Sequence, residues 1–104
     1  MPMSDAVHSY LLEQVGDEEL LQEIYAEFLT SFRTGLDAFR AAMADQDQNR
    51  MRHTAHTLKG NASIVGETAM KQLAIDMENG VIAQNRDAYQ NALVQLEDAF
   101  QKCL

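Results

Sequence analysis

A stripe of apolar side chains in the first half of the chain constrains the fold more than any other feature. Its members recur every three or four residues: Leu21, Tyr25, Phe28, Phe32, Leu36, Phe39 and Met43. This spacing places all of them on one face of an α-helix. The stripe predicts a helix from Glu18 to about Ala44, roughly 40 Å long. Such an amphipathic helix needs partner helices to cover its apolar face.

A short helix is predicted ahead of this long one. Ser4 is a possible N-cap, and the helix then runs to about Gln14 with one apolar face. Gly16 interrupts the pattern, and Asp17 is placed to cap the long helix.

A third helix is predicted after the polar segment 45–49. Two starts compete, a capping box of Asp45 with Gln48 and a cap at Asp47. Gly66 is expected to end this helix as its C′ residue. Its apolar stripe comprises Met51, Ala55, Leu58, Ala62 and Val65.

The last part of the chain contains two further stripes. A fourth helix has Met70, Leu73 and Met77 on its inner face, and its predicted end is Asn79-Gly80, with fraying as far as Gln84. Asn85 can cap a fifth helix. The stripe of that helix comprises Tyr89, Leu93, Leu96, Phe100 and Cys103.

These elements predict an all-α fold. The 104 residues suffice for a single domain, residues 1–104, and no segment has the alternation of a strand. Four amphipathic helices joined by short turns bury their stripes best as an antiparallel up-down-up-down four-helix bundle. The short N-terminal helix is expected to lie across one end. Because the bundle uses up the apolar stripes, a monomer is expected.

Composition narrows the function further. The net charge of −8 argues against nucleic-acid binding, which needs clustered Lys and Arg. No window approaches the roughly 20 apolar residues of a membrane span, and no signal peptide is recognisable. Cys103 is the single cysteine, so neither an intramolecular disulfide nor a thiolate metal site is expected. A cytoplasmic location fits these features best.

The third helix carries the residues that could perform chemistry. At 100° per residue, His56 lies on its outer face, and Arg52, Lys59 and Ser63 point in nearly the same direction. Gly60 follows one turn later, although a helical glycine costs about 1 kcal/mol relative to alanine. Its missing side chain would let another molecule approach His56. A neutral imidazole is a competent nucleophile near pH 7, and the cations could neutralise a phosphoryl group on it.

The run AHTLKGNASIVG, residues 55–66, resembles the signature of histidine phosphotransfer (HPt) domains. The family pattern is H-x-x-K-G, followed by a small residue and a second glycine. The matching positions are His56, Lys59, Gly60, Ala62 and Gly66. Residues 16–20, Leu73-Ala74 and Glu78 also resemble the family, so the likeness covers essentially the whole chain.

The resemblance implies a phosphorelay role in two-component signalling. His56 would carry a phosphoryl group, on its ring nitrogen farther from the backbone, between the aspartates of receiver domains. Lys59 would stabilise that group, and Gly60 would leave room for the receiver. The implied partners are receiver domains of a response regulator or a hybrid histidine kinase. The domain would have no kinase activity of its own and no cofactor, and the Mg²⁺ for transfer would belong to the receiver.

Glu78 is a further candidate, from helix geometry. If the third and fourth helices are antiparallel about residues 66 and 67, Glu78 is level with His56 and could fix its tautomer through the other ring nitrogen. The helical wheel argues against this, because His56 points away from the apolar stripe. Both interpretations stay open.

Other functions compete with the phosphorelay. A non-catalytic adaptor would use the same bundle to bind receivers without carrying phosphate. A histidine-based enzyme would need a second catalytic group near His56, and a zinc site at His53 and His56 lacks an evident third ligand. The expected partner surface is the third helix around His56 with the adjoining second helix, and Met51 and Met70 could flank it.

Overall fold

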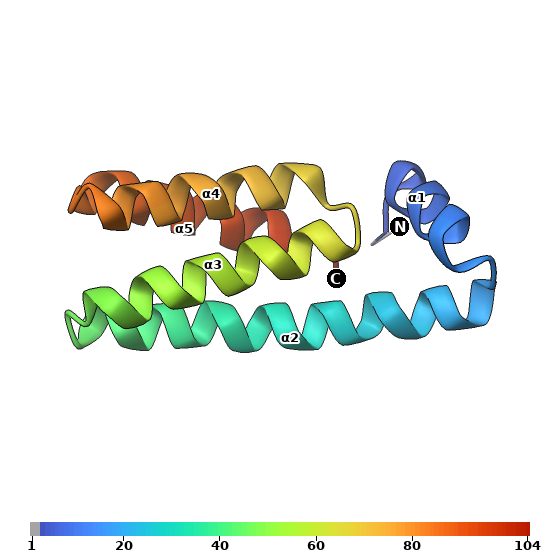
Figure 1. Ribbon diagram of the computed structural model, residues 1–104, viewed down its shortest axis with the longest axis horizontal. Helices are drawn as coiled ribbons and strands as arrows, with labels where there is room; N and C mark the ends of the chain where they lie inside the picture. The colour runs from blue at the N-terminus through green and yellow to red at the C-terminus, as the bar shows by residue number, and fades with distance from the viewer. Residues whose placement is uncertain (1–2) are drawn as a thin grey trace.

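The computed structural model describes residues 3–104, which leaves the first two residues of the predicted domain outside it. Every element in the described part is a helix (Figure 1). The five helices are α1 (Asp5–Val15), α2 (Glu18–Ala44), α3 (Gln48–Ile64), α4 (Thr68–Ile82) and α5 (Arg86–Gln101). The predicted all-α class and the extra N-terminal helix are therefore confirmed.

Polar caps start four of the helices. Ser4, Asp17, Asp47 and Asn85 each accept a hydrogen bond from a backbone N–H in the first turn of α1, α2, α3 and α5. Asp47 accepts from the Arg50 amide at 3.1 Å, so it caps α3 and the competing capping box at Asp45 does not form. Gly66 follows α3 with a φ of 76°, the left-handed conformation expected of a residue just past a helix end.

The helices form an elongated bundle of 42 × 20 × 18 Å. Helix α2 runs along its whole length, whereas α3, α4 and α5 accompany only its C-terminal part (Figure 1). Helix α5 packs back on α2, where the rings of Phe32 and Phe100 stack with centroids 5.6 Å apart. Helix α1 packs on the N-terminal part of α2, beyond the ends of the other helices.

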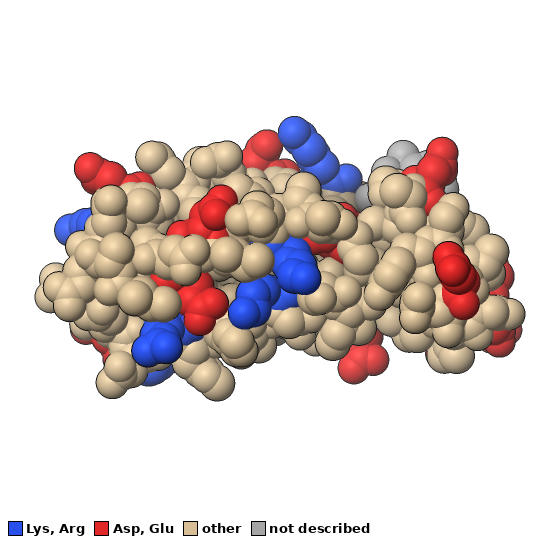
Figure 2. Space-filling view, turned by 45° about the horizontal axis from the view of Figure 1, so that its top comes forward, with Lys and Arg blue, Asp and Glu red and all other residues tan. Residues whose placement is uncertain are grey.

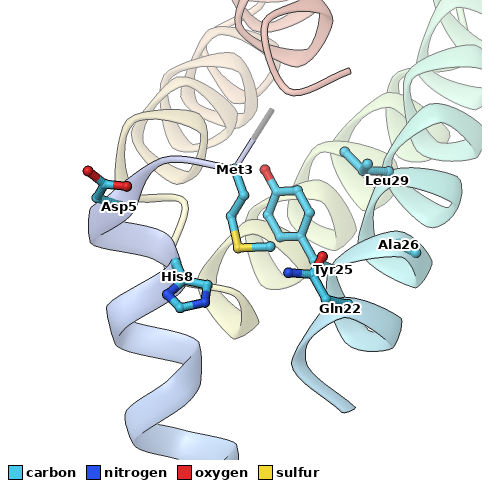
Figure 3. Close-up of a pocket in the computed structure, with 7 residues that line it drawn as sticks. All are labelled: Met3, Asp5, His8, Gln22, Tyr25, Ala26 and Leu29. Carbon is cyan, nitrogen blue, oxygen red and sulfur yellow. The ribbon is translucent and has the colours of Figure 1, made fainter. Parts of the chain in front are cut away.

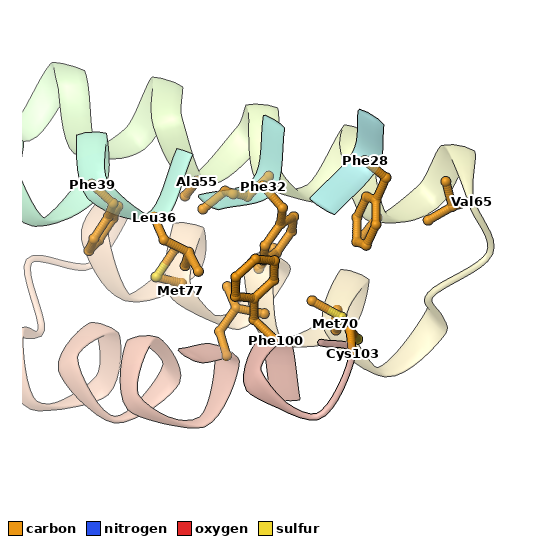
Figure 4. Packing of buried hydrophobic residues seen from close by; sticks show 14 of the residues in the cluster. Phe28, Phe32, Leu36, Phe39, Ala55, Val65, Met70, Met77, Phe100 and Cys103 are labelled. Carbon is orange, nitrogen blue, oxygen red and sulfur yellow. Dashed lines mark hydrogen bonds between the residues drawn. The ribbon is translucent and has the colours of Figure 1, made fainter. Parts of the chain in front are cut away.

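The predicted stripes meet in one apolar core (Figure 4). Phe32, Phe39 and Leu58 are fully buried. Two positions differ by one residue from the prediction, because Ala42 and Ala74 are buried while Met43 and Leu73 are only half-buried. Met43 and Leu73 pack against this core from its edge.

Helix α4 ends two residues after the predicted Asn79-Gly80, within the fraying range that was predicted to reach Gln84. The helix continues to Ile82, and Gly80 is buried within it. A Cβ atom on Gly80 would lie 2.9 Å from the backbone nitrogen of Tyr89. This glycine therefore permits the close approach of α5 to α4 and does not terminate the helix.

A polar contact joins three segments where the bundle meets α1. The Tyr25 hydroxyl donates a 2.5 Å hydrogen bond to Glu67 Oε2 in the turn between α3 and α4. The Cys103 thiol lies 3.6 Å from the same oxygen. We call these three residues the Tyr25–Glu67–Cys103 clamp. It connects α2, the α3–α4 turn and the end of the chain.

Candidate functional site

His56 lies on the outer face of α3. The neighbouring Ala55 and the nearby Leu58 are fully buried, and they orient the helix so that His56 points outward. As a result 63% of the His56 side chain is exposed. The imidazole is accessible to another protein, as the helical wheel predicts.

Glu78 of α4 lies beside the imidazole. Its Oε2 atom is 3.4 Å from His56 Nδ1, and its Oε1 atom is 3.8 Å from Lys59 Nζ. Only 15% of the Glu78 side chain is exposed, so the carboxylate is held between α3 and α4. Glu78 lies beside His56 along the bundle axis, where the antiparallel arrangement of the third and fourth helices predicts it. The outward direction of His56 does not prevent this contact. This contact engages Nδ1, so Nε2 is the ring nitrogen that it leaves available.

Gly60 has open space where a side chain would be. A Cβ atom built there would meet nothing within 4 Å outside its own helix. In contrast, a Cβ on Gly35 would lie 2.6 Å from the Leu58 side chain, and one on Gly80 would meet the backbone of α5. Packing within the chain therefore accounts for Gly35 and Gly80 but not for Gly60.

A shallow cavity of about 320 Å³ adjoins His56 on the side of Glu78. It is lined by Asn49, Arg52 and His53 together with His56 and Glu78. Arg52 is thus brought to the site, as its direction on the wheel predicts. Sequence reasoning missed Asn49, although its position two turns before His56 on the same face was a usable signal.

Three sequence-predicted residues are placed differently. Ser63 is exposed on α3, but it does not line this cavity. Met51 and Met70 are buried, with exposures of 5% and 2%, so the expectation that they flank a docking patch is wrong. Their apolar side chains face the core because both positions belong to the inner stripes of α3 and α4.

A groove between α2 and α3 lies next to Gly60 on the other side. Ile24 and Phe28 of α2 and Asn61 and Ile64 of α3 are among its lining residues. Ile64 is 68% exposed, the largest exposed fraction among the large apolar side chains of residues 3–104. His56, Gly60 and Ile64 succeed one another at intervals of four residues, so this surface continues from the imidazole toward α2. We call it the α2–α3 groove.

Metal sites and membrane-spanning helices are both absent from residues 3–104. Within that range no group of three or more His, Cys, Asp or Glu side chains is positioned to hold a metal ion. None of the helices in it combines the length and hydropathy that crossing a bilayer requires. Outside this site, His8 contacts Glu18 through Nε2 at 2.7 Å.

Comparison with known proteins identifies the family. The family model described as "Hpt domain" matches residues 23–104, from early in α2 to the C-terminus. Neither the comparison with curated proteins nor that with solved structures found a match. The matched region contains α3, α4, α5, all of α2 but its first five residues, and the motif around His56. Together with the exposed imidazole on an all-helical bundle, this match shows that the chain belongs to the Hpt domain family, whose members serve in histidine phosphotransfer.

Proposed function

We propose that His56 accepts a phosphoryl group from an aspartyl phosphate of one receiver domain and passes it to the aspartate of another. The observation that carries this proposal is the environment of the imidazole. Its Nδ1 lies 3.4 Å from a largely buried carboxylate, most of its side chain is exposed, and a helical glycine with no internal packing role lies one turn away. Family membership supports the same role.

Both half-reactions of the proposed transfer proceed without loss of a proton from the imidazole ring. The Nε2 lone pair forms the N–P bond while the P–O bond to the receiver aspartate breaks, and the carboxylate departs with the electron pair. In the second half, a carboxylate oxygen of the next receiver forms the new O–P bond and the N–P pair returns to Nε2. The proton on Nδ1 stays in place throughout.

Glu78 is proposed as the positioning residue for that proton. A carboxylate 3.4 Å from Nδ1 favours the tautomer with the proton on Nδ1, which leaves the lone pair on Nε2. It also stabilises the positive charge that develops on the ring as the N–P bond forms. Small rotations of the two side chains bring the pair to the usual hydrogen-bond length of about 2.9 Å.

Lys59 and Arg52 are proposed to stabilise the phosphoryl group. Lys59 Nζ lies near Glu78 before phosphorylation, and its long side chain can turn toward an incoming dianion. Arg52 lines the cavity beside the ring. Ser63, exposed on the same helix, is a weaker candidate because it does not line that cavity.

The receiver is proposed to dock on the α2–α3 groove and the outer face of α3. Gly60 lets its active site approach His56, and the exposed Ile64 supplies apolar contact area. The Mg²⁺ required for transfer is expected on the receiver, with no cofactor on this chain. A monomeric, cytoplasmic carrier without kinase activity of its own fits this assignment.

The test is phosphotransfer from a receiver domain carrying a radiolabelled aspartyl phosphate. The wild-type domain should gain label that is labile to acid and stable to base, and His56→Gln should gain none. His53→Gln is the matched control, because His53 lies one turn earlier on the same exposed side of α3. Equal labelling of His56→Gln and the wild type would refute the assignment.

The adaptor hypothesis predicts a different result in this experiment. An adaptor would bind receivers, yet no label would reach the wild-type domain from any of several receivers. Calorimetry on the same samples measures binding independently of labelling. Binding with labelling indicates a carrier, whereas binding without labelling indicates an adaptor.

A further inference from the structure

Helix α2 continues well beyond the end of α5, and this leaves part of its packing face uncovered. Gln22, Ala26 and Leu29 lie on the same face as Arg33 and Leu36, at the spacing of four and three residues that marks one helix face. The C-terminal part of this face contacts α5, where Arg33 lies over the Phe100 ring. Helix α5 ends at Gln101, and no later helix covers the N-terminal part.

A cavity of about 520 Å³ occupies the uncovered stretch, between α1 and α2. Met3, Tyr25, Ala26 and Leu29 give it an apolar surface, and His8 lies at its edge (Figure 3). We call it the α1–α2 slot. The slot extends from Gln22 to Leu29, about two turns of α2. It lies close to the line that α5 would follow if that helix were longer.

The charge around the slot is strongly negative. Residues 3–32 contain seven of the sixteen carboxylates of the chain and none of its eight Lys and Arg residues. Asp5 lines the slot, and Glu18 contacts its edge residue His8. On the face drawn in Figure 2, the end of the molecule formed by α1 has red side chains and no blue ones. The potential at this end therefore attracts cations.

The slot faces away from the phosphotransfer surface. The α2–α3 groove uses Ile24, Phe28 and Ser31 of the same helix. At 100° per residue these positions lie on the opposite side of α2 from Gln22, Ala26 and Leu29. A partner in the slot would therefore leave His56 and the groove free.

We propose that the α1–α2 slot is a second docking surface, which binds a basic amphipathic helix of a partner protein. The apolar face of that helix packs on Ala26 and Leu29 in the position α5 does not reach, and its Lys and Arg residues lie near Asp5 and Glu18. A second copy of this chain is disfavoured, because it would bring the same acidic end into contact. Anionic membranes and nucleic acids are disfavoured for the same reason. The proposal does not rest on the phosphoryl carrier role.

The test uses an amphipathic helical peptide of leucine and lysine, about 14 residues long because shorter helices are marginal in water. Titrated into the ¹⁵N-labelled domain, it should shift the amide resonances of α1 and of residues 22–29. The affinity should fall by roughly tenfold between low and physiological salt, because the charged rim contributes to binding. A peptide with glutamine in place of leucine should not produce these localised shifts.

Ala26→Arg is the decisive variant, since it places a bulky cation in the slot at an exposed helical position. It should abolish binding while the fold, read by circular dichroism, and the labelling of His56 stay unchanged. Val94→Arg, at an exposed site on α5, is the matched control and should bind as the wild type does.

Two outcomes would overturn the proposal. Shifts spread over all acidic residues, or equal weakening by Ala26→Arg and Val94→Arg, would reduce the interaction to general charge attraction. Concentration-dependent dimerisation that Ala26→Arg removes would assign the slot to self-association. Neither result depends on whether His56 is phosphorylated, so failure here and failure of the carrier role are separate.

Discussion

At the scale of single residues, Gly60 most clearly separates a requirement of function from a requirement of folding. A glycine within a helix lowers stability, and at Gly35 and Gly80 close packing inside the molecule explains the choice. At Gly60 the space is open. We propose that its bare backbone serves the approach of another molecule to His56.

Gly60→Ala is expected to separate stability from transfer. Because alanine is the better helix former and its Cβ meets nothing, the free energy of unfolding should rise by up to about 1 kcal/mol. Transfer from a receiver should slow by tenfold or more, since displacing the reacting groups by about 1 Å costs roughly a hundredfold. Urea denaturation and the rate of labelling measure the two effects.

Gly80→Ala is the control for this experiment. Its Cβ would lie 2.9 Å from the Tyr89 backbone nitrogen, so this variant should lose stability. A Gly60→Ala protein that is less stable than the wild type, or that is labelled equally fast, would contradict the interpretation of Gly60.

Replacing Glu78 tests the positioning of the imidazole. Glu78→Ala should slow phosphorylation of His56 by roughly tenfold or more, as loss of a carboxylate that orients a functional histidine does elsewhere. Glu78→Gln keeps a hydrogen-bond acceptor near Nδ1 without the charge, so its phosphorylation rate should lie between those of the wild type and Glu78→Ala. Labelling rates give the effect, and thermal melting shows whether the fold persists. An unchanged rate in the alanine variant would remove Glu78 from the mechanism.

At the scale of helices and turns, two connections share an unusual backbone. Gln46 and Gln84, each just before an N-cap residue, have φ angles of 53° and 55°. This left-handed conformation costs a non-glycine residue about 1 kcal/mol or more. Each glutamine allows a tight turn that brings the next cap, Asp47 or Asn85, to its helix.

Gln84→Gly should therefore stabilise the domain. Glycine adopts a positive φ freely, so we expect a gain of about 0.5–1 kcal/mol in the free energy of unfolding, measured by chemical denaturation. Gln95→Gly, in the exposed middle of α5, should instead lose about 1 kcal/mol. A loss of stability in Gln84→Gly would show that the turn is not strained.

The Tyr25–Glu67–Cys103 clamp predicts a pH dependence of stability. Burial, together with the contacts to Glu67 and Cys103, raises the pKa of the Tyr25 hydroxyl, and burial raises the pKa of the Cys103 thiol. Both groups therefore stay protonated in the folded state at pH values where they ionise in the unfolded chain. Their contribution is fully present at neutral pH and is lost as the pH rises above about 9.

Tyr25→Phe isolates this effect. The loss of a hydrogen bond to a carboxylate should lower the free energy of unfolding by about 1–2 kcal/mol at pH 7. Between pH 7 and pH 10, the free energy of unfolding from denaturation curves should also fall less steeply with rising pH than in the wild type. The reason is that one of the two titrating groups is gone. Parallel declines in the two proteins would exclude the clamp as the cause.

At the scale of the whole molecule, most of the fold follows from local patterns. The period of the apolar stripes and four polar caps place the helices to within a few residues. The residue at which α4 ends was not predictable from the sequence. Glycine is found both at helix ends and within helices where a neighbouring helix approaches closely, and the sequence does not distinguish the two roles. Gly80 has its role only through Tyr89, which lies on another element.

The site was partly predictable for the same physical reason. His56, Lys59 and Gly60 share one helix, so their relative directions follow from the helical period. The contact with Glu78 crosses to α4 and needed the antiparallel arrangement as well. The α1–α2 slot was beyond sequence reasoning altogether, because it depends on how far α5 reaches along α2 in space.

The most direct test of the central claim is NMR of the phosphorylated domain, with the histidine rings labelled with ¹⁵N and a phosphorylated receiver as donor. We predict a phosphorus–nitrogen coupling at Nε2 of His56, while Nδ1 of the same ring remains protonated beside Glu78. A phosphoryl group on Nδ1, on His53 or on any other residue would contradict it.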